Sequence, residues 1–182
     1  MTPWHGSNEP TTWDQGHCIR YTPDGNGHSR HATVARFVPP VRVAGWLRMT
    51  GWDGRRTSLS EGFDGAHVHV GYVQNSRNYV ASLVRRDGHA KVAVEYGWMG
   101  YRTLRWLGAG PELVMERVYL FQIDWLEGRI VTRVSNEAGV WEMDAPIPVD
   151  RRLPVGAVGF RFDNLTALAG FEVRQLPMEG TA

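Results

Sequence analysis

Apolar side chains recur at every second position through most of the chain after residue 30. Residues 119–125, for example, read YLFQIDW, so a large apolar residue occupies each odd-numbered position. Successive side chains of a β-strand point to opposite faces of a sheet, and a strand with one buried face therefore shows this period. The same spacing predicts strands over residues 31–37, 43–50, 66–73, 79–86, 91–96, 129–135, 140–145, 157–163 and 168–176.

Glycine and proline separate these predicted strands. The dipeptides at 87–88 (Asp-Gly) and 127–128 (Glu-Gly) each stand between two strand segments, and Asp-Gly tolerates the positive φ angles of a tight hairpin turn. The best helical candidate, 104–115, is interrupted by two glycines and a proline, so no helix is predicted. About eleven or twelve short strands joined by such turns predict an all-β fold of two packed antiparallel sheets.

The length of 182 residues suits one domain with a single large core. No internal repeat or change of composition divides the chain, and the strand pattern predicts a domain over 17–176. We expect an irregular N-terminal arm over 1–16 and a flexible tail over 177–182. The single cysteine, Cys18, cannot form an intrachain disulfide, so folding should not require an oxidising compartment.

Charge and hydropathy restrict the expected partners. The formal net charge is +1 and the basic residues are scattered among acidic ones, which predicts no nucleic-acid partner. No apolar run approaches the roughly 20 residues that span a membrane, and the N-terminus lacks a signal-peptide pattern. We therefore expect a cytoplasmic protein without a membrane partner; secretion would require a leader removed from the N-terminus. The oligomeric state is not predicted.

Several segments resemble, in the same order along the chain, the concanavalin A-like lectin/glucanase superfamily. The segment 154–164 (PVGAVGFRFDN), followed by 169–174 (AGFEVR), resembles the two closing strands of such domains. The segments 78–88 and 119–128 resemble their middle strands. This resemblance implies an all-β, two-sheet antiparallel jelly-roll sandwich with a glycan-binding groove on its concave sheet. It also implies a carbohydrate- or glycoside-recognising domain, because lectins, carbohydrate-binding modules, glycoside hydrolases and polysaccharide lyases share this fold.

Aromatic side chains are the main candidates for sugar contact. The chain contains 8 Trp and 6 Tyr, which offer flat apolar faces with a polar edge, although most such rings fill cores. Trp46 is the strongest exception, because Leu47 and Met49 occupy the opposite, core-facing side of its strand. Trp98 and Tyr101 lie in a glycine-rich connection of the type that rims binding grooves.

Two histidines share a face of one predicted strand. His67 and His69 alternate with Val68, Val70 and Tyr72, so the imidazoles should lie on the face opposite those three residues, roughly 7 Å apart. That spacing would let them share a ligand or a proton-transfer role, which makes them the candidate catalytic residues. The competing interpretation is a solvent-facing pair on a polar outer surface. Two imidazoles do not complete a metal site, and none is predicted.

The closing strands supply two further candidates. Arg161 and Asp163 alternate with Phe160 and Phe162, so they should face away from the core as ligand-binding residues. Arg161 could hold a hydroxyl or carboxylate by paired hydrogen bonds. Calcium is common in the superfamily, so the resemblance implies Asp163 or Glu172 as candidate ligands, but no cofactor is required. The predicted groove therefore combines Trp46, Arg48, Trp98, Tyr101, Arg161 and Asp163 with the two histidines.

The sequence leaves enzymatic activity open. A glycoside hydrolase needs two carboxylates about 5 to 9 Å apart, and the superfamily's Glu-x-Asp-x-x-Glu strand motif is absent. The nearest alternatives are Asp124 with Glu127 and the same-face pair Glu142 and Asp144. A glycoside hydrolase or polysaccharide lyase would use His69 or a strand carboxylate as general acid or base in the same groove. A subunit that binds a protein partner is the third hypothesis.

Overall fold

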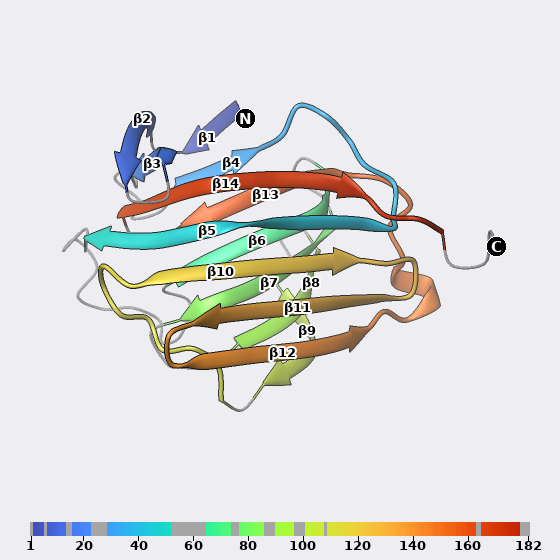
Figure 1. Ribbon diagram of the computed structural model, residues 1–182. Helices are drawn as coiled ribbons and strands as arrows, with labels where there is room; N and C mark the ends of the chain where they lie inside the picture. The colour runs from blue at the N-terminus through green and yellow to red at the C-terminus, as the bar shows by residue number, and fades with distance from the viewer. Residues whose placement is uncertain are drawn as a thin grey trace.

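The chain forms a sandwich of two antiparallel sheets that face each other (Figure 1). The computed structural model describes residues 2–5, 7–13, 16–22, 29–51, 65–73, 77–85, 90–96, 101–107, 109–162 and 165–178. Sheet A consists, in spatial order, of β1 (Thr2–His5), β4 (Ser29–Ala32), β13 (Ala157–Phe162), β6 (Gly65–Tyr72), β7 (Arg77–Arg85), β8 (Ala90–Tyr96) and β9 (Tyr101–Leu107). Sheet B consists of β12 (Gly139–Pro146), β11 (Arg129–Asn136), β10 (Val118–Trp125), β5 (Val41–Gly51), β14 (Leu165–Gln175), β3 (Gly16–Thr22) and β2 (Ser7–Trp13). The predicted all-β architecture of two antiparallel sheets is confirmed.

The core lies between the sheets, where the alternating apolar residues meet. Phe160 of sheet A contacts Phe121 and Phe171 of sheet B edge to face, with ring centroids 6.2 Å and 5.0 Å apart. The four odd-numbered residues of 119–125 are all buried, as the alternation predicts. Burying each such side chain stabilises the fold by about 1.5–3 kcal/mol, so these strands carry much of the packing energy.

The N-terminal region departs from its prediction. Residues 2–22 contain three strands, whereas an irregular arm was expected over 1–16: β1 pairs with β4 in sheet A, and β2 pairs with β3 in sheet B. Prolines at positions 3 and 10 interrupt the local pattern, yet β1 and β2 are edge strands, where a missing N–H costs no ladder hydrogen bond. Residues 101–107 form the edge strand β9, although the sequence predicts no strand there. The hydrogen bonds that β9 makes with β8 stabilise it, and they do not depend on alternation along the strand.

The hydroxyl groups of two buried tyrosines hydrogen-bond the backbone of two loops. The hydroxyl of Tyr79 accepts a hydrogen bond from the Leu153 N–H (2.9 Å) and donates one to the Arg151 carbonyl (2.7 Å), beside a 3₁₀ turn at Val149–Arg151. The hydroxyl of Tyr119 accepts from the Val114 N–H (3.0 Å) and donates to the Glu112 carbonyl (2.7 Å). Burial also raises the pKa of Tyr119. These bonds attach the loops that contain residues 112–114 and 151–153 to the buried rings of the sandwich.

Candidate functional site

His67 and His69 lie in the middle of sheet A, on its outer face. Their strand β6 runs between β13 and β7, and its alternate residues Val68 and Val70 belong to the core. The two histidines are only 3% and 6% exposed, because β6 is buried along its whole length on both faces. The interpretation of a solvent-facing pair is therefore wrong, and these imidazoles form a buried polar group outside the core.

Asn78 orients His69. The Nδ1 atom of His69 lies 2.8 Å from Oδ1 of Asn78 on the neighbouring strand β7, and both residues are buried. An amide oxygen can only accept a hydrogen bond, so Nδ1 of His69 carries the hydrogen. In the neutral ring, Nε2 is then the acceptor nitrogen. Asn78 thus sets both the tautomer of His69 and the direction in which its acceptor points.

Ser82, also on β7, orients His67. His67 pairs with Ser82 in the β6–β7 ladder, and its Nδ1 atom lies 3.0 Å from the buried Ser82 hydroxyl. A hydroxyl both donates and accepts, so this contact fixes the ring orientation and admits either tautomer. The alternation along β6 indicates the histidine pair but not Asn78 and Ser82, since their contacts depend on the register of two strands.

Tyr72 joins this group because β6 is irregular near its end. Gly71 has a φ of +65°, which residues with a Cβ rarely adopt, and the β6–β13 register shifts between Ala157 and Gly159. The Tyr72 ring consequently lies 6.2 Å from the His69 ring, edge to face, and packs with Ala32 and Ala157 apart from the main core. The prediction that Tyr72 shares a face with Val68 and Val70 is wrong, since the bulge reverses the alternation.

Arg161 lies beside the histidines. It pairs with His67 in the β13–β6 ladder and is half-buried, while Phe160 and Phe162 on the same strand belong to the core. The predicted facing of Arg161 is therefore confirmed. Asp163 and Trp98 lie outside the described residues, as does the side chain of Tyr101. We refer to His67, His69, Asn78, Ser82 and Tyr72 as the histidine cluster.

Trp46 and Arg48 do not lie with the histidine cluster. Their strand β5 belongs to sheet B, where Leu47 and Met49 face the core and Trp46 points outward, 36% exposed. The outer face of sheet B is on the opposite side of the sandwich from the outer face of sheet A. The sequence predicts correctly that Trp46 points away from the core on its own strand. It does not predict that β5, which carries Trp46, and β6, which carries the histidines, belong to different sheets.

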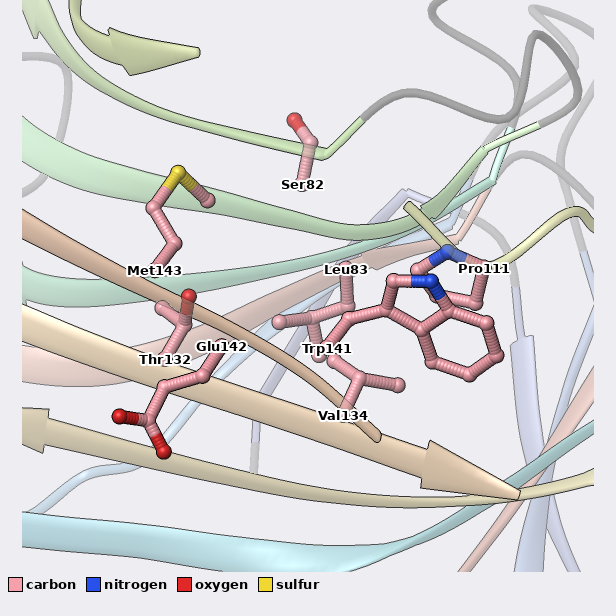
Figure 2. A pocket seen from close by; sticks show the side chains of 8 residues that line it. All are labelled: Ser82, Leu83, Pro111, Thr132, Val134, Trp141, Glu142 and Met143. Carbon is pink, nitrogen blue, oxygen red and sulfur yellow. The ribbon is translucent and has the colours of Figure 1, made fainter. Parts of the chain in front are cut away.

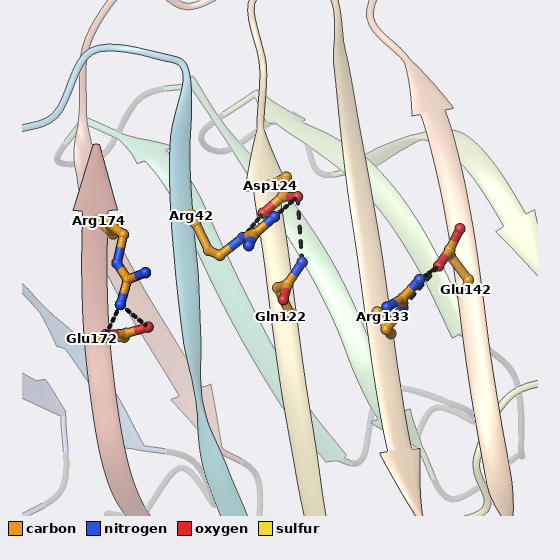
Figure 3. Close-up of polar contacts among 7 residues, drawn as sticks. All are labelled: Arg42, Gln122, Asp124, Arg133, Glu142, Glu172 and Arg174. Carbon is orange, nitrogen blue, oxygen red and sulfur yellow. Dashed lines mark hydrogen bonds and ion pairs between the residues drawn. The ribbon is translucent and has the colours of Figure 1, made fainter. Parts of the chain in front are cut away.

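The strand carboxylates considered for hydrolysis also lie on sheet B, bound by arginines (Figure 3). Asp124 accepts two hydrogen bonds from Arg42, of 2.7 Å and 2.8 Å, which raises the pKa of Arg42. Glu142 accepts 2.8 Å and 2.5 Å bonds from Arg133. Asp144 lies 3.4 Å from Arg129 on the same exposed face. These three carboxylates lie on the outer face of sheet B and His69 on that of sheet A, so they do not form an acid–base pair with His69.

A small cavity opens between the sheets at the β7–β12 side (Figure 2). It is lined by Ser82, Leu83, Pro111, Thr132, Val134, Trp141, Glu142 and Met143. Its volume of about 10 Å³ admits about one water molecule and no sugar ring.

No metal-binding group of three or more His, Cys, Asp or Glu side chains occurs in the part of the chain that the structure describes. Across the same described ranges, no helix has the length and apolar character needed to cross a membrane.

Solved structures similar to this chain include a carbohydrate binding module and proteins of lectin-like fold. The carbohydrate binding module CBM66 from Bacillus subtilis aligns with a TM-score of 0.66 over 95% of this chain and 95% of its own, at 12% identity. A protein of unknown function with a galectin-like fold from Bacillus subtilis gives 0.67 over 96% and 88%, at 11% identity. The exoplasmic/lumenal domain of VIP36, in a Ca²⁺/Man3GlcNAc-bound form, gives 0.60 over 96% and 84%, at 11% identity.

These likenesses confirm the concanavalin A-like jelly-roll fold that the closing strands implied. By sequence, the chain matches no family model and no curated protein. At identities near 10%, the alignments show the fold alone, so any ligand must be argued from this chain's own residues.

Proposed function

We propose that this chain is a carbohydrate- or glycoside-recognising domain that binds its ligand on the outer face of sheet A, at the histidine cluster. The observation that carries the proposal is the pair of oriented imidazoles on the central strand: His69 with Asn78 at 2.8 Å and His67 with Ser82 at 3.0 Å. The saccharide-bound or saccharide-binding proteins that share the fold support the ligand class.

The chemistry of the cluster suits sugar hydroxyls. A hydroxyl group both donates and accepts, so it can accept from the guanidinium of Arg161, which is half-buried beside the oriented imidazoles. Tyr72 adds an apolar ring edge beside His69, at 6.2 Å between centroids. A ligand without a matching hydroxyl would bind more weakly, because a hydrogen bond to a charged group such as the Arg161 guanidinium contributes about 1.5–3 kcal/mol.

Calcium and the cell compartment belong to the same proposal. VIP36 is a Ca²⁺-bound relative in fold, whereas Glu172, one of the two calcium ligands expected here, is bound by Arg174 at 3.1 Å. We propose binding that does not depend on calcium, which titration with and without chelator would test. We also propose a cytoplasmic location and a small soluble glycoside as ligand, which fractionation of the native cells would test.

The deciding experiment is a glycan and glycoside panel read by thermal shift, followed by titration of each hit. His69→Ala and Asn78→Ala should each weaken binding of a hit about tenfold or more while the far-side variant Arg133→Ala leaves it unchanged. Circular dichroism of each variant separates lost binding from lost folding.

Two results would contradict the proposal. If every folded His69 and Asn78 variant binds its hit as tightly as the wild type, the histidine cluster is structural and the ligand binds elsewhere. If incubation of a hit yields a cleaved product that disappears in His69→Ala, the site is that of a hydrolase or lyase and not of a lectin.

A further inference from the structure

The outer face of sheet B carries an exposed tryptophan that the histidine cluster does not use. Trp46 is 36% exposed at the middle of β5, the central strand of that sheet. It pairs with Leu120 of β10 on one side, itself 37% exposed, and with Ala169 of β14 on the other. The row across the three strands is therefore apolar and has one large flat ring at its centre.

A glycine lets the ring lie close to the sheet. Gly170 has a φ of +55° and occupies the irregular stretch of β14 between Ala169 and Glu172. A Cβ built on Gly170 would lie 3.0 Å from Cδ1 and 3.5 Å from Nε1 of Trp46. The pyrrole edge of the indole thus lies against the β14 backbone, which limits the motion of the ring and lowers the entropy lost when a ligand stacks on it.

Polar groups flank this apolar row, and the charged ones are ion-paired, including Arg48 of β5 with Glu116 at 3.7 Å. Gln122 follows Leu120 two positions along β10, and Glu172 follows Gly170 two positions along β14. Figure 3 shows Gln122 and Glu172 on these strands. Glu172 is bound by Arg174 and the neighbouring Asp124 by Arg42, so each carboxylate is balanced by a guanidinium. A neutral ligand that has both an apolar face and hydrogen-bonding edges fits this arrangement better than an ion does.

The apolar area is too small for a protein partner. The exposed large apolar side chains described on this face are Trp46, Leu120 and Val140, at 36%, 37% and 66% exposure. Even at about 250 Å² for each whole side chain, these fractions amount to less than about 350 Å². A stable protein interface buries about 800 Å² on each partner. One pyranose ring, by contrast, covers about one indole.

We infer that Trp46 is the platform of a second saccharide site, on the face opposite the histidine cluster. Its ligand class is a neutral hexopyranose unit, whose C–H face stacks on the indole while its hydroxyls reach the indole N–H and the Gln122 amide. A domain with a site on each outer face can hold two saccharide units at once, and a polymer that presents one unit many times makes weak binding at a single site measurable. The site uses residues distinct from the histidine cluster, so each can fail without the other.

Affinity electrophoresis in gels that contain dextran, mannan or galactan tests this inference. The wild type should be retarded by at least one of these neutral polymers, and Trp46→Ala should weaken retention about threefold to tenfold, as expected for the loss of one ring-stacking contact. Trp46→Phe should keep part of the retention, and Val140→Ala, on the same face but on β12, should keep all of it. His69→Ala should leave the contribution of Trp46 measurable, because the double variant should bind less than either single one.

Three results would overturn the inference. The first is an absence of retardation of the wild type by all three polymers. The second is a Trp46→Ala protein that folds and is retained like the wild type. The third is a Trp46→Ala protein whose only change is a lower mass in analytical ultracentrifugation, which would assign the face to contact between two copies of the chain.

Discussion

Removing the hydroxyl of Tyr79 tests how much its two hydrogen bonds to the loop at residues 151–153 stabilise the fold. Tyr79→Phe keeps the buried ring and its edge-to-face contact with Trp125, whose centroid is 6.2 Å away. The change deletes the bond accepted from the Leu153 N–H and the bond donated to the Arg151 carbonyl. Each bond contributes about 1 kcal/mol net, and a partner left unpaired in a partly buried place costs up to about 1 kcal/mol more. We therefore expect a loss of about 2–3 kcal/mol in the free energy of unfolding.

Urea denaturation followed by tryptophan fluorescence at pH 7 measures this loss directly. The midpoint should fall while the m-value stays constant, because the surface exposed on unfolding does not change. In a thermal scan, the same loss should lower Tm by about 5–10 °C for a chain of this length. Tyr119→Phe, which removes the equivalent pair of bonds to Val114 and Glu112, should give a loss of similar size. A Tyr79→Phe protein within about 0.5 kcal/mol of the wild type would refute the view that these hydroxyls hold the loops.

Three further outcomes are expected for stability. Burial lowers the pKa of His31 from 6.5 to about 4. The neutral imidazole therefore contributes fully to the free energy of unfolding above pH 6.5, and about 3 kcal/mol of that free energy is lost as the pH falls from 6.5 to 4. His31→Leu should flatten the stability–pH curve over this range, and an unchanged slope would contradict this. Gly156→Ala should lower the free energy of unfolding by more than about 3 kcal/mol or prevent folding, because its Cβ would lie 2.1 Å from the Gly71 carbonyl carbon. The control Gly128→Ala, whose Cβ would meet the flexible side chain of Arg152, should lower it by less than about 1 kcal/mol in the same thermal assay. Arg133→Ala should change the free energy of unfolding by less than about 1 kcal/mol in a urea titration, since its ion pair with Glu142 is exposed, and a larger loss would show that this pair is part of a cooperative network.

Much of the local structure could be predicted from residue order. The segment 119–125 was expected to bury its odd-numbered residues and does, and Arg161 was expected to face away from Phe160 and does. Trp46 likewise lies opposite Leu47. These predictions succeed because the orientation of a side chain relative to its own strand depends only on the period of the extended backbone.

The candidate site was only partly predictable, because it depends on contacts between strands. Alternation predicts that His67 and His69 share one face of their strand. Their partners, Asn78 and Ser82, come to lie beside them only through the β6–β7 register. Tyr72 moved to the histidine side through the positive φ of Gly71. A glycine within a strand can mark such a bulge, so Gly71 indicates that the alternation can change there. The sequence does not indicate which face Tyr72 then takes.

The sequence by itself determined that the chain forms strands, where most of them lie, and which residues of each strand turn toward the core. Tertiary structure alone decided that β5 joins sheet B and β6 joins sheet A, which places Trp46 and the histidine cluster on opposite outer faces. The physical reason is that alternation is a property of one strand, whereas sheet membership follows from hydrogen bonds between strands far apart in the chain, such as β5 with β14. A single predicted groove thereby became two separate faces, each with its own proposed saccharide site.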